Sequence, residues 1–201
     1  MSSTQTKPVR ENSRAVLPEL DVAPWRRWFS LQAPFRWHLR SLDLGYTLDV
    51  GCGDGQELMH LDGHGVGIEH DPALLARARQ RGCLVLSPQD FLASSFAREG
   101  TFDSLLIHHI LERIPLSEAR DLIGDYLPSL RPGGKLLMIS RQEAGHASEK
   151  DNVEFMTFAR LRDLYTQLEM TCERTYSFPL PRFAGRFFRH NEFVAIGTKA
   201  P

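Results

Sequence analysis

The sequence predicts a three-layer α/β sandwich, in which helices cover both faces of a mostly parallel, seven-stranded sheet with an antiparallel last strand. Short β-branched or aliphatic runs alternate along the chain with longer stretches of helical character. Parallel strands need long and usually helical crossovers, and continuous apolar strands are typical of sheets that are covered on both faces. The alternation and the apolar strands together favour this class.

The chain begins with a polar segment and a helical one. Residues 1–20 carry no periodicity, which predicts a disordered tail. From residue 21 to about residue 43 apolar residues recur at roughly helical intervals, and Pro24 and Pro34 suit helix starts. We expect this stretch to form an N-terminal helical cap on a single domain that spans residues 21–201.

Seven apolar runs are the expected strands. They are residues 46–50, 65–69, 83–86, 102–107, 134–140, 170–180 and 192–200. Residues 72–82 and 116–130 are the clearest helices between them. The last two runs are joined by about a dozen residues without a clear helix. This short connection predicts a closing antiparallel pair.

Composition limits the function classes. A chain of 201 residues with 42% hydrophobic residues can bury one core. The formal net charge of -1 gives no general attraction for nucleic acid, and no apolar run approaches the roughly 18 to 20 residues of a membrane span. Cys52, Cys83 and Cys172 have no CxxC spacing, which argues against a disulfide framework. We therefore expect a cytoplasmic monomer or homodimer without nucleic-acid partners or stable membrane insertion.

The stretch LDVGCGDGQE, residues 48–57, is the strongest local motif. Gly51, Gly53 and Gly55 occupy alternate positions directly behind an apolar run. In open α/β sheets ligands bind beyond the carboxyl ends of the strands, and glycines there let a ligand approach the main chain. A plain strand-to-helix turn is the alternative for a single Gly-x-Gly. Three alternate glycines favour a ligand pressed against the loop.

Residues near this loop indicate the kind of ligand. Gln56 stands where a dinucleotide fingerprint needs its last glycine, and no phosphate loop is present. Asp49 could attract a cationic group. Glu69, about 20 residues further on, suits an acid that accepts hydrogen bonds from ribose hydroxyls. The expected ligand therefore carries a ribose and an amine.

Five segments together resemble class I S-adenosylmethionine-dependent methyltransferases. They are LDVGCGDG, GIEHDPALLARAR, PQDF, FDSLLIHHILERI and LRPGGKLLMIS, all within residues 44–140. The terminal EFVAIGTK is similar to the last strand of that family. The resemblance implies a Rossmann-like fold with S-adenosylmethionine as cofactor and S-adenosylhomocysteine as product.

The resemblance also implies positions for cofactor binding. Asp49, Gly51 and Gly53 would hold the methionine part and Glu69 the ribose. Asp90 and the backbone of Phe91 would hold the adenine. The expected set is completed by Cys52, His70 and His108.

Methyl transfer by in-line displacement depends mainly on alignment, so a base is needed only where the acceptor must lose a proton early. His109 is the candidate, since the family often has a histidine there; the alternative is that it packs beside the cofactor. His108 and His109 would point to opposite faces if their strand continued. We therefore expect at most one of them to meet the pocket.

The sequence indicates the residues that bind the acceptor less clearly than those that bind the cofactor. Arg141, Glu143 and His146 follow an expected strand at the ligand edge of the sheet and are the candidates for substrate binding. Residues 177–193 mix phenylalanines with arginines, which could line the acceptor pocket or stack on bases. The commoner arrangement, which we expect here, has the rings inside and the guanidinium groups in solvent.

Metal chemistry is not expected. His60, His64 and His70 lie near one another in sequence, but no cysteine or carboxylate completes a ligand set. The leading hypothesis is a methyltransferase for a small-molecule acceptor. The alternatives are a methyltransferase for RNA or protein, a non-catalytic cofactor-binding module and, more remotely, a nicotinamide dehydrogenase.

Overall fold

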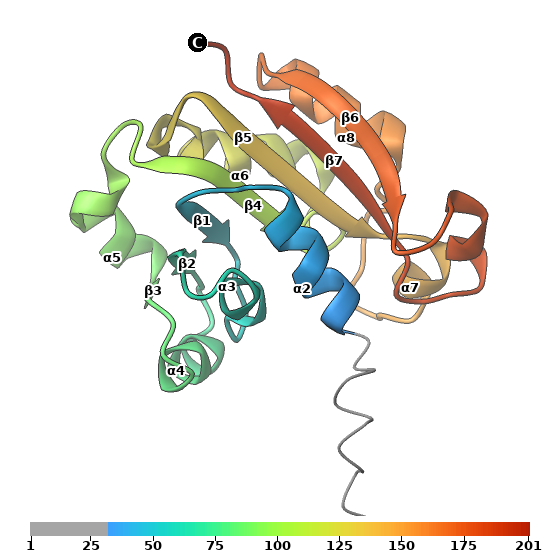
Figure 1. The fold of residues 1–201 in the computed structure, drawn as a ribbon, viewed down its shortest axis with the longest axis horizontal. Coiled ribbons are helices and arrows are strands. Elements are labelled where there is room, and N and C mark those ends of the chain that lie inside the picture. Colours follow the sequence, from blue (N-terminus) through green and yellow to red (C-terminus); the bar gives the residue numbers. More distant parts are fainter. Residues whose placement is uncertain (1–31) are drawn as a thin grey trace, which may run out of the picture. The chain divides into compact units, whose positions relative to one another are not determined.

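The computed structural model describes residues 32–201. The predicted tail and the first part of the predicted helical cap lie outside the described residues. Helix α2 (Gln32–Ser41) falls within the range of the predicted cap. It leads into the first strand of the sheet (Figure 1).

A seven-stranded sheet forms the centre of this part of the chain (Figure 1). The strands are β1 (Thr47–Val50), β2 (Gly65–Ile68), β3 (Val85–Leu86), β4 (Phe102–His108), β5 (Leu130–Arg141), β6 (Thr171–Phe178) and β7 (Glu192–Thr198). Their order is β3-β2-β1-β4-β5-β7-β6. Strands β1 to β5 pair in parallel, whereas β7 is antiparallel to both β5 and β6. The predicted mostly parallel sheet with an antiparallel last strand is confirmed.

Helices cover both faces of the sheet. They are α2, α3 (Gln56–His60), α4 (Pro72–Gln80), α5 (Pro88–Ala93), α6 (Leu116–Tyr126), α7 (Glu143–Ala147) and α8 (Phe158–Gln167), with short 3-10 turns η1 (Ser95–Ala97), η2 (Leu127–Ser129) and η3 (Arg182–Arg186). One apolar cluster joins α5, α6 and α8 to one face of the sheet. Two smaller clusters hold α2 against the centre of the other face and join α3 to α4 and β3. Figure 1 shows α2 in front of the sheet, with α3 and α4 near β1, β2 and β3.

The pairing register brings distant residues to one edge of the sheet. Val50 ends β1 opposite Ile107 of β4, and His108 pairs with Ile139 of β5. Because β7 runs in the opposite direction, its first residue, Glu192, lies opposite Arg141 at the end of β5. This edge therefore collects the ends of the central parallel strands and the beginning of β7.

His38 of helix α2 contacts two residues of β6. The Nε2 atom of its ring lies 2.6 Å from the hydroxyl oxygen of Tyr176, and the ring stacks on Phe178 with centroids 3.9 Å apart. Burial, the largest effect, lowers the pKa of His38 to about 4, and Arg174 acts in the same direction while Glu192 opposes it. The neutral imidazole is thus part of the packing between α2 and the sheet.

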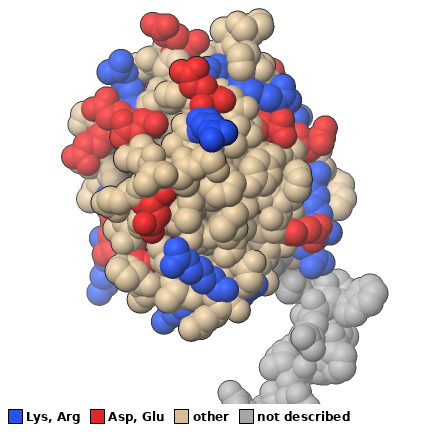
Figure 2. Space-filling model, turned by 90° about the vertical axis from the view of Figure 1, so that its left-hand side faces the viewer, with Lys and Arg blue, Asp and Glu red and all other residues tan. Residues whose placement is uncertain are grey.

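The surface carries both signs of charge. Figure 2 shows lysine and arginine side chains interspersed with aspartate and glutamate on the face that it displays. This mixture agrees with the formal net charge of -1. Among the helices in residues 32–201, none combines the length and the apolar character that crossing a membrane requires.

Candidate active site

The glycine loop joins β1 to α3 through left-handed backbone. Gly51 and Gly53 have φ angles of 70° and 56°, which side chains rarely tolerate. The amides of Gly51 and Cys52 donate hydrogen bonds to the carbonyl of Ile68, over 2.8 and 3.0 Å. A Cβ atom at Gly53 would have no atom within 4 Å. The loop is therefore fixed to β2 while Gly53 faces open space.

The carboxylate of Glu69, the residue after β2, holds this loop in place by hydrogen bonds. Its Oε2 accepts a hydrogen bond from the amide of Gly53 over 2.9 Å, and its Oε1 accepts one from the amide of Asp71 over 2.8 Å. The residue is buried, whereas the adjacent His70 is exposed and lies 3.2 Å from the same carboxylate. Each carboxylate oxygen has a second lone pair, so Glu69 can accept two further hydrogen bonds.

A cavity of about 840 Å³ runs along the edge where the strands end. Its lining includes the following predicted site residues: Gly51, Cys52, Gly53, Glu69, His70, His108, His109 and Arg141. Helix α2 adds Phe35, His38 and Leu39, and Glu57, Tyr126 and Glu192 contribute from α3, α6 and β7. The volume lies in the range of pockets that bind small molecules and cofactors.

Asp49 lies close to this cavity but does not line it. It is fully buried, and within the described part of the chain neither carboxylate oxygen has a hydrogen-bond partner. Burial and then the charge of Glu57 raise the pKa of Asp49 well above its ordinary value. An unpartnered buried carboxyl is costly, and a cationic group in the cavity would relieve it.

The predicted adenine contacts lie in α5. Asp90 is exposed in the first turn of this helix, where its amide donates to the hydroxyl of Ser87 over 3.1 Å. Phe91 is buried in the main apolar cluster. Neither side chain lines the cavity. Pro88 is the residue of α5 that does so.

Both histidines at the end of β4, His108 and His109, line the cavity, so the expectation that at most one would do so is wrong. The physical reason is that the strand does not continue. His109 has a φ angle of 56°, a left-handed conformation that turns its side chain to the same side as that of His108. The two rings stack with centroids 3.8 Å apart. Such backbone costs on the order of 1–2 kcal/mol for a non-glycine residue and tends to occur at functional sites.

His108 lies between two carboxylates. Its Nδ1 is 2.9 Å from Glu57 Oε1, and its Nε2 is 3.6 Å from Glu192 Oε1. Burial opposes protonation, but Glu57 and Glu192 outweigh it and raise the pKa of His108 well above its ordinary value. Burial alone would raise the pKa of the Glu57 and Glu192 carboxyls. The neighbouring histidines outweigh burial and lower the pKa of both carboxyls to about 2. His108 is therefore an imidazolium between two carboxylates.

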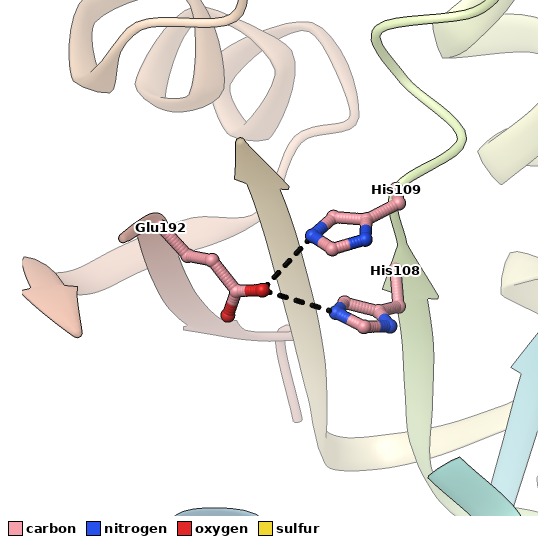
Figure 3. Close-up of side chains that lie close together, drawn as sticks. All are labelled: His108, His109 and Glu192. Atoms are coloured by element: carbon pink, nitrogen blue, oxygen red, sulfur yellow. Dashed lines mark ion pairs between the residues drawn. The ribbon is translucent and has the colours of Figure 1, made fainter. Parts of the chain in front are cut away.

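His109 shares the same carboxylate but differs in charge. Its Nε2 lies 3.0 Å from Glu192 Oε1, a close contact in which the ring nitrogen is not aligned for a hydrogen bond (Figure 3). Burial, and then the neighbouring charge on His108, lower the pKa of His109, although Glu192 partly offsets them. His109 is thus neutral near pH 7 and able to accept a proton.

His108, His109 and Glu192 form the one group among the described residues whose ligand-type atoms all lie within 4.8 Å of one another. A shared ion would need the in-plane lone pairs of both imidazoles to meet about 2 Å from each nitrogen. The stacked ring planes are inclined by only 28°. Planes so nearly parallel do not meet that close to the rings, so the geometry favours an ion-paired network over a metal centre.

The predicted acceptor residues separate in the structure. Arg141 lines the cavity, where its Nη1 is buried without a hydrogen bond and lies 3.6 Å from Glu112 Oε1. Glu143 is paired with Arg182, and His146 packs against Phe155. Neither Glu143 nor His146 lines the cavity. Of the three, only Arg141 is positioned to contact a ligand there.

The aromatic segment after β6 differs from the expected arrangement. Phe183 and Phe187 are 71% and 85% exposed. The side chain of Arg182 is partly exposed; it pairs with Glu143 and lies over the ring of Phe193. The expectation of buried rings is therefore wrong for Phe183 and Phe187, whereas Arg186 and Arg189 are exposed as expected.

Two important cavity residues were absent from the sequence analysis. Glu57 stands in the first turn of the helix after the glycine loop, a position that faces the same ligand edge. Glu192 begins the antiparallel last strand, which places it at that edge. Both positions follow from the predicted topology, so a search for polar residues at strand and helix starts would have found them.

Comparisons with known proteins agree with this architecture. Residues 48–138 match the family described as Methyltransferase domain. No curated protein matches the sequence. Among solved structures, a methyltransferase dependent on S-adenosylmethionine from Archaeoglobus fulgidus superposes with a TM-score of 0.66 at 11% identity, covering 87% of this chain and 97% of that one.

Two further solved structures share the fold. One is a methyltransferase dependent on S-adenosylmethionine from Methanosarcina mazei, with a TM-score of 0.60 at 16% identity over 90% of this chain and 99% of that one. The other is magnesium protoporphyrin IX methyltransferase from Synechocystis PCC 6803 with bound S-adenosylhomocysteine, with a TM-score of 0.58 at 14% identity over 88% and 93%. The glycine loop, the strand order and the family match agree with one another: residues 48–138 match a methyltransferase domain, and the chain has the fold of these S-adenosylmethionine-dependent methyltransferases.

Proposed function

We propose that the protein is an S-adenosylmethionine-dependent methyltransferase that methylates a small-molecule acceptor by in-line displacement. The observation that supports this most is that one cavity of about 840 Å³ is lined by Glu69, the glycine loop, His109 and Arg141 together. Cofactor and acceptor must meet within such a space for a direct transfer. A volume of this size suits a cofactor together with a modest acceptor.

The cofactor's place follows from the groups at one end of this cavity. Glu69 would accept hydrogen bonds from the ribose hydroxyls, while Gly51, Cys52 and Gly53 leave room for the methionine part. Asp49 would face the ammonium group from beneath the loop, and His70 would lie beside the ribose. Asp90 and the backbone of Phe91 remain the proposed adenine contacts. When bound, S-adenosylmethionine supplies a methyl group already activated on a sulfonium.

The proposed place of the acceptor is beside the lining residues that follow β4 and end β5. His109 would remove the acceptor's proton, because it is neutral and lines the cavity. His108 would contribute a fixed positive charge behind it. Arg141 would orient the acceptor through its guanidinium group, and Glu143 and His146 would act on the acceptor only through their neighbours.

The acceptor class is tested with S-adenosylmethionine that carries a deuterated methyl group. The purified protein is incubated with this cofactor and a host extract, and the products are separated into low-mass, protein and RNA fractions. Mass spectrometry should find the label in a low-mass compound. Label confined to protein or RNA would contradict the proposal, and the Gly53→Val variant provides the background.

The role of His109 is tested once the acceptor is known. Replacing His109 with alanine should lower turnover by about 100-fold, in line with the usual contribution of a positioned base. The affinity for S-adenosylmethionine, measured by calorimetry, should change little. His64→Ala is the matched control, since His64 is an exposed histidine outside the cavity lining. An unaltered rate in His109→Ala would leave His109 with a packing role only.

A macromolecular acceptor is the second candidate, and one observation favours it. Phe183 and Phe187 form an exposed aromatic pair on η3 and the residue after it. Exposed rings beside arginines can stack on unpaired bases. If RNA were the acceptor, its binding would weaken steeply as salt rises, and replacing both rings with alanine would abolish it.

A further inference from the structure

Glu192 reaches the cavity from a part of the chain far from the glycine loop. It is the first residue of β7, is buried, and lines the cavity. Its backbone is held in place because the side-chain amide of Gln142 donates a hydrogen bond to its carbonyl over 2.8 Å. The carboxylate is therefore delivered to a fixed position beside the two histidines.

We infer that Glu192 is a positioning residue for catalysis: it orients the ring of His109 and stabilises the positive charge that His109 gains from the acceptor's proton. This inference rests on the proposed role of His109 as the base. In that step the acceptor's bond to hydrogen breaks and the proton passes to Nδ1 of His109. The electron pair of that bond forms the new bond to the methyl carbon, and the pair of the broken carbon–sulfur bond stays on sulfur.

The contact geometry supports this assignment. Nε2 of His109 lies 3.0 Å from Glu192 Oε1, and Figure 3 shows its second ring nitrogen on the side away from the carboxylate. With a proton on Nε2, the lone pair on Nδ1 is the one left for an acceptor. The contact is not yet aligned as a hydrogen bond, and catalytic hydrogen bonds commonly tighten only when ligands are bound.

The left-handed backbone of His109 supports it further. The conformation is held by the hydrogen bond from the amide of His109 to the carbonyl of Ile139, over 3.0 Å. Extended backbone at this position would carry the ring to the other face of the sheet, away from Glu192. The strained turn is thus what brings the base and its carboxylate together.

His108 keeps this carboxylate ionised and in place. It bridges Glu192 and Glu57, at 3.6 and 2.9 Å, and stacks against the ring of His109. The positive charge of His108 therefore lowers the pKa of His109, whereas the negative charge of Glu192 raises it. Further charged or titratable groups are Arg113, Arg141 and His190 in the cavity lining, and Glu112, which lies after β4 and acts on His109 from outside that lining.

The test uses the full chain labelled with ¹⁵N-histidine, in complex with S-adenosylhomocysteine. Two-bond ¹H–¹⁵N correlations report the protonation state and tautomer of each ring, and the His109→Gln variant assigns the signal. In the wild type, His109 should be neutral with its proton on Nε2. In Glu192→Gln its pKa should fall by about one unit, because an attractive charge is lost.

Glu57→Gln is the matched control, because it removes the other carboxylate of His108. His108 then loses its charge more readily, and the weaker repulsion on His109 offsets the loss of the attraction from Glu57, so the pKa of His109 should fall less than in Glu192→Gln. Once an acceptor is known, the acid limb of the pH–rate profile should move further in Glu192→Gln than in Glu57→Gln.

Three results would overturn the inference. They are a proton on Nδ1 of His109 in the wild type, an unchanged pKa in Glu192→Gln, and a pKa shift in Glu57→Gln at least as large as that in Glu192→Gln. If Glu192→Gln fails to fold, the tautomer of His109 in the wild type still tests the inference. Glu192→Asp is a second variant, which keeps the negative charge. Calorimetric titration with S-adenosylhomocysteine checks that each sample binds the ligand. Failure of the inference alone would leave the His109→Ala defect intact, whereas failure of the proposed function would remove that defect.

Discussion

Asp49 has an unusual environment for a carboxyl group in a ligand site. It is buried without a hydrogen-bond partner among residues 32–201, and its pKa is raised by burial and by Glu57. A group in this state takes up a proton that the arrival of a cation would expel. Asp49 therefore couples the binding of a positively charged ligand to proton release.

We predict that S-adenosylmethionine binding releases a proton from Asp49. Calorimetric titrations at roughly pH 6 in two buffers of different ionisation enthalpy measure this release directly. The Asp49→Asn variant should bind with little or no proton exchange. Asp54→Asn is the control, because Asp54 lines the same cavity but is partly exposed and paired with Arg81. Equal proton release in wild type and Asp49→Asn would contradict the prediction.

The two glycines that the sequence treats alike differ in their surroundings. A Cβ atom at Gly51 would lie 1.9 Å from Cδ1 of Ile110, whereas one at Gly53 would meet nothing within 4 Å. Both positions have positive φ angles, so both substitutions carry backbone strain. The difference between them is therefore the collision with Ile110.

Replacing Gly51 with valine should accordingly lower the melting temperature more than replacing Gly53 does. Gly53→Val should stay folded but lose at least about tenfold in affinity for S-adenosylmethionine, since its side chain enters the space beside the loop. Thermal denaturation and calorimetry on both variants check this. Full cofactor affinity in a folded Gly53→Val protein would show that the ligand does not touch this part of the loop.

The sequence could predict the residues of the glycine loop because their chemistry is local. Backbone freedom at Gly51 and Gly53 follows from their lack of a side chain, and the order of strands places them at the ligand edge. The histidine pair could not be predicted in this way. Its common orientation depends on the left-handed turn at His109, which tertiary contacts stabilise against the preference of the residue.

Among the elements, the strands were the most predictable, since each is a short apolar run between turn residues. The short helix α7 was not among the elements expected from the sequence. Its stability comes from elsewhere in the chain: Glu143 pairs with Arg182 of η3, and Gly145 lies so close to the backbone of Arg189 that a Cβ atom would be 2.3 Å from its carbonyl oxygen. Contacts between residues some forty positions apart leave no periodic signal.

The residues expected to bind the acceptor were also only partly predictable from the sequence. Sequence order placed Arg141, Glu143 and His146 together after β5, yet only Arg141 lines the cavity. Formation of α7 carries the other two away from the edge of the sheet. Glu192 arrives from the opposite direction because its strand is antiparallel. The residues that meet in the cavity are therefore set by topology more than by distance along the chain.

For the whole molecule, His38 makes stability depend on pH. Its pKa is about 4 in the folded protein, against an ordinary value of 6.5. Between these two values the unfolded chain binds a proton that the folded chain does not, so acid favours unfolding. This single group should cost up to about 3 kcal/mol as the pH falls from 6.5 to 4.

The prediction is checked by urea denaturation of wild type and His38→Gln across this pH range. The difference in free energy of unfolding between the two proteins should shrink as the pH falls, because only the wild type loses the contribution of a neutral imidazole. His64→Gln, at an exposed histidine, should follow the wild type. A difference that stays constant with pH would mean that burial does not depress the pKa of His38.

The reversed course of β7 has a practical consequence. The strand starts at the ligand edge with Glu192 and ends, next to the first residues of β5, at the opposite edge. The last residues of the chain therefore emerge at the edge of the sheet opposite to the cavity, and Figure 1 marks that end of the chain beyond β7. An affinity handle or a surface-immobilising linker attached after Pro201 should leave cofactor entry unobstructed in binding measurements on a sensor chip.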